Sequence, residues 1–317
     1  MKRFLFLIIM LSVSVSILLA GGRRDTAVND GRPNVVASIF PAYDFVRQIA
    51  GDRVNLTMLI SPGAESHSFE PSPRDIITIM NSDLFIYVGD SDQWIDRILR
   101  SMNTDEMTIF AMKSAVELIE NEHEHVVDCD DPDCFDDHHT CSLFDEHVWT
   151  SPRNAILIVR AITDLLSEAD PANADLFRQN AAAYIRELEQ LNAAFSEVVA
   201  GALRRTIVFG DRFPFRYFTE AYGLTWYAAF DGCSTQTDPS AARIAFLINK
   251  VRDERIPVVF HIELSNERIA DVVVEATGAR KLMLHSAHNV TRQEFNAGLT
   301  YLEIMRRNVE NLRIALN

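Results

Sequence analysis

The chain is short of positive charge. It carries 30 Lys and Arg residues against 45 Asp and Glu residues, so its formal net charge at pH 7 is −15. A protein that binds phosphate backbones needs clustered Lys and Arg, so this balance argues against a nucleic acid as partner. An acidic protein instead attracts cations.

Long apolar runs are missing after the first twenty residues. A basic amino terminus precedes an apolar run over residues 4–20, which predicts a secretory signal peptide over residues 1–21. The run is short for a membrane-spanning helix, although an uncleaved anchor stays an alternative because Leu18 is not the small residue expected before a cut after Ala20. Gly21 and Gly22 stand where a lipoprotein would have its cysteine, so we expect a periplasmic or cell-surface protein without a lipid anchor.

Cysteine is scarce, with four residues in the whole chain. Cys129, Cys134 and Cys141 share an acidic loop over residues 121–141, and Cys233 stands alone. An oxidising compartment could pair two of the loop thiols, but the sequence does not indicate which two.

Signatures of nucleotide binding and of common hydrolases are also missing. The chain has no GxxxxGK[ST] loop, no GxGxxG after a strand, no GxSxG elbow and no HExxH helix. Their absence favours a binding protein over an enzyme. A secreted zinc-dependent hydrolase stays an alternative because three histidines and an open position can activate water, and so does a metal-binding adhesin.

The chain does contain an alternation of strand-like and helix-like segments. Strands are predicted over residues 34–39, 54–60, 84–88, 206–209, 225–230, 258–262 and 281–284. Helices are predicted over residues 41–50, 73–81, 94–102, 216–222, 241–253 and 266–277. This alternation predicts parallel βαβ units.

Between the two halves, one face of residues 171–199 is apolar at helical spacing, with Asp170 as the predicted cap and Pro171 in the first turn. The predicted fold class is therefore α/β, with two α/β lobes of parallel sheets flanked by helices and joined by one long connecting helix. The predicted boundaries are 33–168 for the N-terminal metal-binding lobe, 170–200 for the connecting helix and 205–317 for the C-terminal lobe.

The nine histidines are distributed unevenly. His67, His147 and His285 stand singly in distant segments that resemble strand ends or turns. Four more histidines cluster in the acidic loop, namely His123, His125, His138 and His139. Imidazole is a common ligand of borderline-soft divalent metals, so the pattern indicates a metal-binding protein, most plausibly for zinc.

Two segments resemble the motifs of a known family. SPGAESHSFEPSPRD at residues 61–75 and DEHVWTSP at residues 145–152 are similar to the PGxxxHxxEPSPxD and DPHxWLSP motifs of the periplasmic metal-binding proteins of zinc and manganese ABC importers, the cluster A-I solute-binding proteins. The likeness spans nearly the whole mature chain. It implies that His67 and His147 are metal ligands, and that a monomer captures zinc between the lobes and delivers it to an ABC importer membrane permease.

The chain also departs from the family pattern in its second half. The family's third histidine is absent, and Asp211 lies in that segment. The family's late aspartate is replaced by His285 in LMLHSAHNV, where His288 is a further candidate ligand. His261, inside a predicted strand, is expected to have a structural role.

The expected zinc ligands are His67, His147 and His285, with Glu263 or Asp211 competing for the fourth place. Such a nitrogen-rich set suits four-coordinate zinc, and manganese is less expected because it prefers carboxylate oxygen.

The acidic loop is the remaining candidate site. Residues 121–141 contain eight Asp or Glu, four His and three Cys, a composition whose self-repulsion disfavours order in the absence of a cation. The resemblance implies a low-affinity collector of zinc beside the main site. The alternative is a solvated insertion without function.

Overall fold

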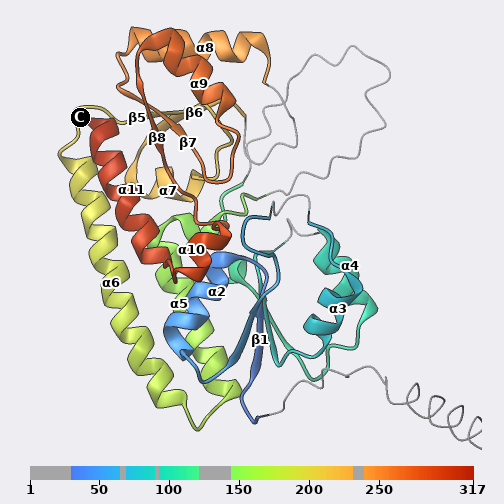
Figure 1. Ribbon diagram of the computed structural model, residues 1–317. Helices are drawn as coiled ribbons and strands as arrows, with labels where there is room; N and C mark the ends of the chain where they lie inside the picture. The colour runs from blue at the N-terminus through green and yellow to red at the C-terminus, as the bar shows by residue number, and fades with distance from the viewer. Residues whose placement is uncertain (1–29, 65–68, 90–92, 121–143, 231–238) are drawn as a thin grey trace, which may run out of the picture. The chain divides into compact units, whose positions relative to one another are not determined.

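Two parallel four-stranded sheets, each flanked by helices, form the fold (Figure 1). The computed structural model describes residues 30–64, 69–89, 93–120, 144–230 and 239–317. The predicted architecture of two α/β lobes is confirmed. The predicted signal peptide lies outside the described residues, and no described helix is both long enough and apolar enough to cross a bilayer.

The first lobe is built on the sheet with the strand order β2-β1-β3-β4. Its strands are β1 (Asn34–Ala37), β2 (Asn55–Met58), β3 (Leu84–Tyr87) and β4 (Thr108–Ala111). Its helices are α2 (Phe40–Ala50), α3 (Pro73–Met80), α4 (Gln93–Ser101) and the short 3-10 helix η1 (Met112–Ala115). The strand β4 was not predicted from the sequence.

The second lobe repeats this topology with the strand order β6-β5-β7-β8. Its strands are β5 (Thr206–Phe209), β6 (Thr225–Ala228), β7 (Val258–His261) and β8 (Arg280–Met283). Its helices are α7 (Arg216–Tyr222), α8 (Ala241–Asp253), α9 (Arg268–Thr277), α10 (Arg292–Asn296) and α11 (Tyr301–Leu316). In each sheet the chain continues from one central strand toward one edge and from the other central strand toward the opposite edge. α/β proteins bind ligands at such a point, beside the carboxyl ends of the central strands.

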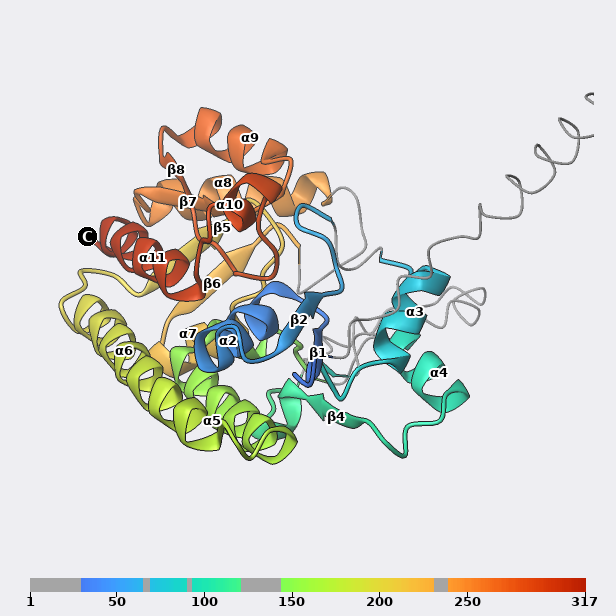
Figure 2. The same cartoon turned by 60° about the horizontal axis from the view of Figure 1, so that its bottom comes forward.

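Along the chain, the two sheets are separated by the 3-10 helix η2 (Val148–Thr150), α5 (Pro152–Ala169) and the long helix α6 (Ala174–Ala200). The apolar face predicted for α6 is buried, and the helix packs against α5, α2 and α11 (Figure 2). The predicted cap was wrong, because Asp170 ends α5 and Asn173 precedes α6. The Asp170 carboxylate accepts hydrogen bonds from Asn173, which closes a turn between the two helices.

Hydrogen bonds tie the segment that follows β8 to the first lobe. The Gly63 amide donates to the Val290 carbonyl at 2.8 Å. The Asn289 side-chain amide donates to the carbonyls of Ser61 at 3.0 Å and Ala64 at 2.9 Å. The loop that carries His67 in the sequence therefore starts next to the segment that follows β8.

A buried carboxylate forms a second tie. Asp44 in α2 is fully buried, and its Oδ2 accepts a hydrogen bond at 2.7 Å from the backbone amide of Tyr301, the first residue of α11. Its Oδ1 pairs with Arg47 at 2.6 Å, and Arg47 also donates to the Leu299 carbonyl. A carboxylate at a helix amino terminus satisfies a free amide and complements the helix dipole.

Gly210, directly after β5, allows a close backbone approach. A Cβ atom at this position would lie 2.3 Å from the Cα of Ala270 in α9. Only glycine lets α9 pack this closely against the carboxyl end of β5, where Asp211 follows.

Candidate metal site

His147 lies in the segment that leads into η2, and its orientation is fixed by Asp145. The side chain is 1% exposed, and its Nδ1 lies 3.1 Å from the Asp145 Oδ1. The same oxygen accepts a hydrogen bond from the His147 backbone amide at 2.9 Å. A carboxylate that accepts the Nδ1 proton leaves the lone pair of Nε2 for a metal, which is how metal-binding histidines are oriented.

Acidic groups surround the buried His147 ring. Burial lowers the pKa of His147, but the charge of Asp145, its hydrogen bond and the charges of Glu146 and Glu263 outweigh burial and raise the pKa above its ordinary value of 6.5. These groups favour a cation at the ring, whether a proton or a metal ion.

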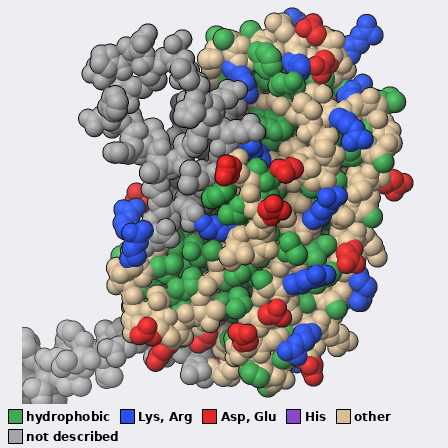
Figure 3. Space-filling model, turned by 180° about the vertical axis from the view of Figure 1, so that it is seen from behind, with side chains coloured by type: hydrophobic (Ala, Val, Ile, Leu, Met, Phe, Trp, Pro, Cys, Tyr) green, Lys and Arg blue, Asp and Glu red, His purple; other side chains and the backbone are tan. Residues whose placement is uncertain are grey.

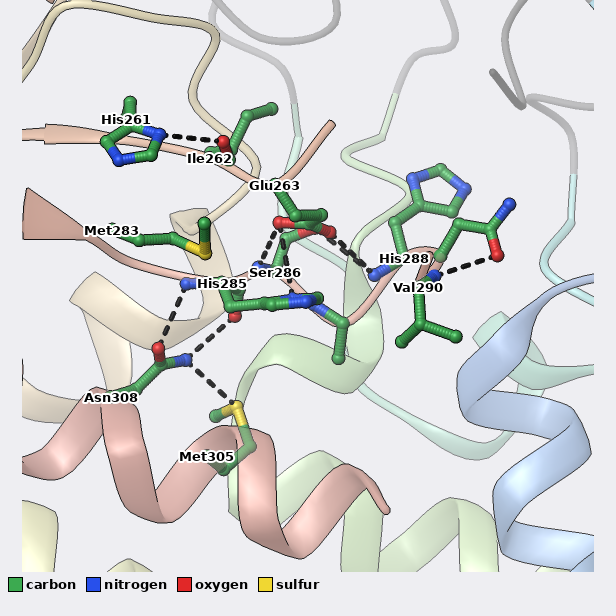
Figure 4. Close-up of polar contacts among 12 residues, drawn as sticks. His261, Ile262, Glu263, Met283, His285, Ser286, His288, Val290, Met305 and Asn308 are labelled. Carbon is green, nitrogen blue, oxygen red and sulfur yellow. Dashed lines mark hydrogen bonds and ion pairs between the residues drawn. The ribbon is translucent and has the colours of Figure 1, made fainter. Parts of the chain in front are cut away.

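In the second lobe, Glu263 holds the loop that follows β8. Its carboxylate accepts hydrogen bonds from the Ser286 amide at 2.7 Å, the Ser286 hydroxyl and the His288 amide at 3.1 Å (Figure 4). Ala287, between these two residues, has a φ of 61°, a left-handed conformation that few residues other than glycine adopt. Glu263 thus stabilises a tight turn that carries two histidines.

The His285 ring bonds within this turn. Its Nδ1 lies 3.0 Å from the Ala287 amide, which donates to it, and 3.4 Å from Glu263. Its backbone is held on both sides by the Asn308 side chain of α11. Because the Nδ1 lone pair accepts this hydrogen bond, the proton of a neutral His285 ring lies on Nε2. In this arrangement neither ring nitrogen has a lone pair left for a metal.

The His288 ring, by contrast, lies against the first lobe. Its centroid is 5.7 Å from that of His147 and 5.0 Å from that of Trp149. The buried Trp149 indole donates to the Ser286 carbonyl at 2.8 Å, which brings the turn and the segment before α5 together. Figure 4 shows the rings of His285 and His288 on different sides of the Glu263 carboxylate.

Asp211 and His261 have structural contacts at the carboxyl ends of β5 and β7. The Asp211 Oδ2 accepts a hydrogen bond from the Ile262 amide at 3.2 Å, and its Oδ1 accepts one from the Arg212 amide at 2.8 Å. The His261 Nδ1 lies 3.1 Å from the Ile262 carbonyl, in agreement with the structural role expected for it.

Several predicted ligands fall outside the described residues. These are His67, His123, His125, His138 and His139. The four cysteines, considered for disulfide pairing, also lie outside the described residues. Among the residues that the structure does describe, no three His, Cys, Asp or Glu side chains are grouped to hold a metal ion. The predicted set of His67, His147 and His285 with Glu263 or Asp211 stays a prediction.

We expect Asp145→Asn to weaken zinc binding by about 10- to 100-fold at pH 8, because the change removes the carboxylate that orients the ring. The pH dependence should also change. If the native His147 ring binds zinc, its raised pKa should make protons displace the metal from above pH 6.5, and without Asp145 this loss should begin at lower pH. Zinc titrations from pH 5 to 8 and NMR of the imidazole protons measure both effects.

Asp175→Asn, at an exposed carboxylate on α6, is the control.

Proton binding by native His147 also stabilises the metal-free fold. That contribution is complete below pH 6.5 and is lost as the pH rises through the higher folded value. Unchanged affinity and pH dependence in Asp145→Asn would contradict the orienting role.

The chain matches known proteins over nearly its full length. The family model described as ZnuA, zinc-uptake complex component A, periplasmic, matches residues 35–315. The zinc-binding lipoprotein AdcA of Streptococcus pneumoniae is 31% identical over 285 residues, which cover 90% of this chain and 56% of that protein. The high-affinity zinc uptake system protein ZnuA of Bacillus subtilis is 27% identical, over 89% of this chain and 87% of that protein.

A solved structure is similar as well. The crystal structure of the Zn(II)-bound ZnuA-like domain of Streptococcus pneumoniae AdcA has a TM-score of 0.74 and 28% identity, over 90% of this chain and 99% of that domain. The chain spans little more than half the length of the AdcA proteins that it matches. The family-model match and the 31% identity to AdcA show that the chain belongs to the family of the periplasmic component A of zinc-uptake complexes.

Proposed function

We propose that the chain is the extracytoplasmic solute-binding protein of a metal ABC importer, which captures zinc and delivers it to the membrane permease. The observation that carries this proposal is the buried His147, oriented by Asp145 and facing His288 from the other lobe, in a chain of the zinc-uptake family. His67 and His147 would bind zinc from the first lobe. On the geometry of the turn, His288 is a better second-lobe ligand than His285.

Zinc is the proposed cargo rather than manganese, because His147 and His288 bring two imidazole rings to the site. Catalysis is not part of the proposal, since a receptor needs a closed, fully ligated site whereas a zinc hydrolase keeps a position open to water. Residues 121–141 are proposed as a weak collector of zinc beside this site. On the described part of the face in Figure 3, Lys and Arg alternate with Asp and Glu, which gives no support to a nucleic-acid partner.

Metal analysis of the purified mature protein tests this function. We expect one tightly bound zinc per chain that equimolar manganese does not displace, and we expect cells that lack the protein to need more zinc for growth. Zinc-dependent cleavage of an ester or peptide, abolished by His147→Ala, would instead identify a hydrolase. Preferential retention of manganese would refute the choice of metal.

A further inference from the structure

Glu146 faces the nitrogen of His147 that is oriented for metal binding. Its Oε1 is closed to solvent and lies 3.7 Å from the His147 Nε2. Asp145 contacts the other nitrogen, Nδ1. Two successive carboxylates therefore flank the ring, one at each nitrogen, and only Glu146 lies on the side where a metal would bind.

The local backbone explains how two neighbouring side chains come to face one point. His147 has φ −81° and ψ 48°, and the Val148 amide donates to the Glu146 carbonyl at 2.8 Å. These values describe an inverse γ-turn centred on His147. In an extended strand the side chains of residues 146 and 147 would point to opposite faces, whereas the turn brings them together.

The separation of the two atoms fits a shared zinc ion. Zinc binds histidine nitrogen and carboxylate oxygen at about 2.0 to 2.2 Å, so two ligands at a tetrahedral angle are about 3.3 to 3.5 Å apart. The 3.7 Å between the Glu146 Oε1 and the His147 Nε2 exceeds this edge by a few tenths of an ångström. A small side-chain rotation would close the difference.

The other acidic side chains near the site are held elsewhere. The Glu263 carboxylate accepts three hydrogen bonds from the turn at Ser286 and His288. The Asp211 carboxylate accepts backbone amides at the ends of β5 and β7. Both carboxylates are thus oriented by backbone groups of the second lobe, whereas Glu146 lies beside the Nε2 of His147.

We propose that Glu146 supplies a carboxylate ligand to the metal that His147 binds, so that two neighbouring residues coordinate the same ion. This inference rests on the proposed function, because it assumes that zinc is bound at His147. Glu146 would fill the coordination place that Glu263 and Asp211 were predicted to contest.

The test is Glu146→Gln, which keeps the size of the side chain and removes its charge. Zinc affinity, measured by competition with a chelator, should fall by roughly 100-fold or more, since loss of a direct ligand should exceed the 10- to 100-fold effect of an outer partner. A crystal structure of the zinc-loaded native protein should place a Glu146 carboxylate oxygen about 2.0 to 2.2 Å from the metal. Glu189→Gln, on the exposed face of α6, is the matched control.

The outcomes separate this inference from the proposed function. If the native protein holds zinc, His147→Ala loses it and Glu146→Gln keeps native affinity, the inference fails and the function stands. Weaker binding by the variant, with the Glu146 oxygens of the zinc-loaded native protein beyond bonding distance of the metal, would reject ligation and leave Glu146 a nearby charge only. If neither the native protein nor its variants bind zinc tightly, the function itself fails. Thermal melting of the metal-free variant checks its folding, and Glu146→Asp, which should not restore native affinity, provides a second variant.

Discussion

The variant His147→Ala is expected to bind zinc more than about 100-fold more weakly than the native protein, because it removes a direct ligand rather than an outer partner. The ring is buried, is oriented by Asp145 and has the Glu146 carboxylate at its other nitrogen. Chelator competition at pH 8 measures the loss. Asp145 would still accept the backbone amide of residue 147, so we expect the variant to fold.

The matched control is His261→Ala, which removes another buried imidazole, from β7. Its ring bonds the backbone of its own strand end, so zinc affinity should stay within a few-fold of the native value. Native zinc affinity in His147→Ala would show that the metal binds elsewhere, with the acidic loop as the next place to look.

Asp44→Ala should lower the free energy of unfolding by about 2 to 4 kcal/mol, because it removes a buried carboxylate that pairs with the partly exposed Arg47 and satisfies a buried amide. The change deprives Arg47 of its carboxylate and leaves the buried Tyr301 amide at the start of α11 without an acceptor. Urea unfolding of the metal-free protein measures the difference.

The fully exposed Asp175 provides the comparison, since Asp175→Ala should lower stability far less than Asp44→Ala. A similarly small effect of Asp44→Ala would mean that the contact between α2 and α11 contributes little to the fold.

Much of the fold could be predicted because its pattern is local. The apolar spacing of α6 and the alternation of strands and helices are visible in the sequence, and the structure confirms them. The strand β4 (Thr108–Ala111) lies at the edge of its sheet and buries only Phe110, so its apolar pattern is too weak to predict a strand. The end of α5 at Asp170 was taken for the start of α6, because aspartate before proline is also typical of a helix start.

The metal site was less predictable because it depends on two turns. Sequence alone does not show which of His285 and His288 faces the first lobe, since the left-handed Ala287 decides the direction of each ring. The sequence does not indicate Glu146 as a ligand, because its place beside the His147 Nε2 follows from a γ-turn that has no clear sequence signal.

The hydrogen bonds between the lobes have a kinetic consequence. Trp149 donates to Ser286, Tyr301 donates to the Trp149 carbonyl, and Asn289 reaches two carbonyls beyond β2. A rigid-body rotation of one lobe relative to the other would break all of these hydrogen bonds together, whereas rearrangement of a short loop would break few of them. Loop motions take nanoseconds to microseconds and hinge motions microseconds to milliseconds, so we expect zinc to enter and leave through local rearrangement of loops while the contact between the lobes persists.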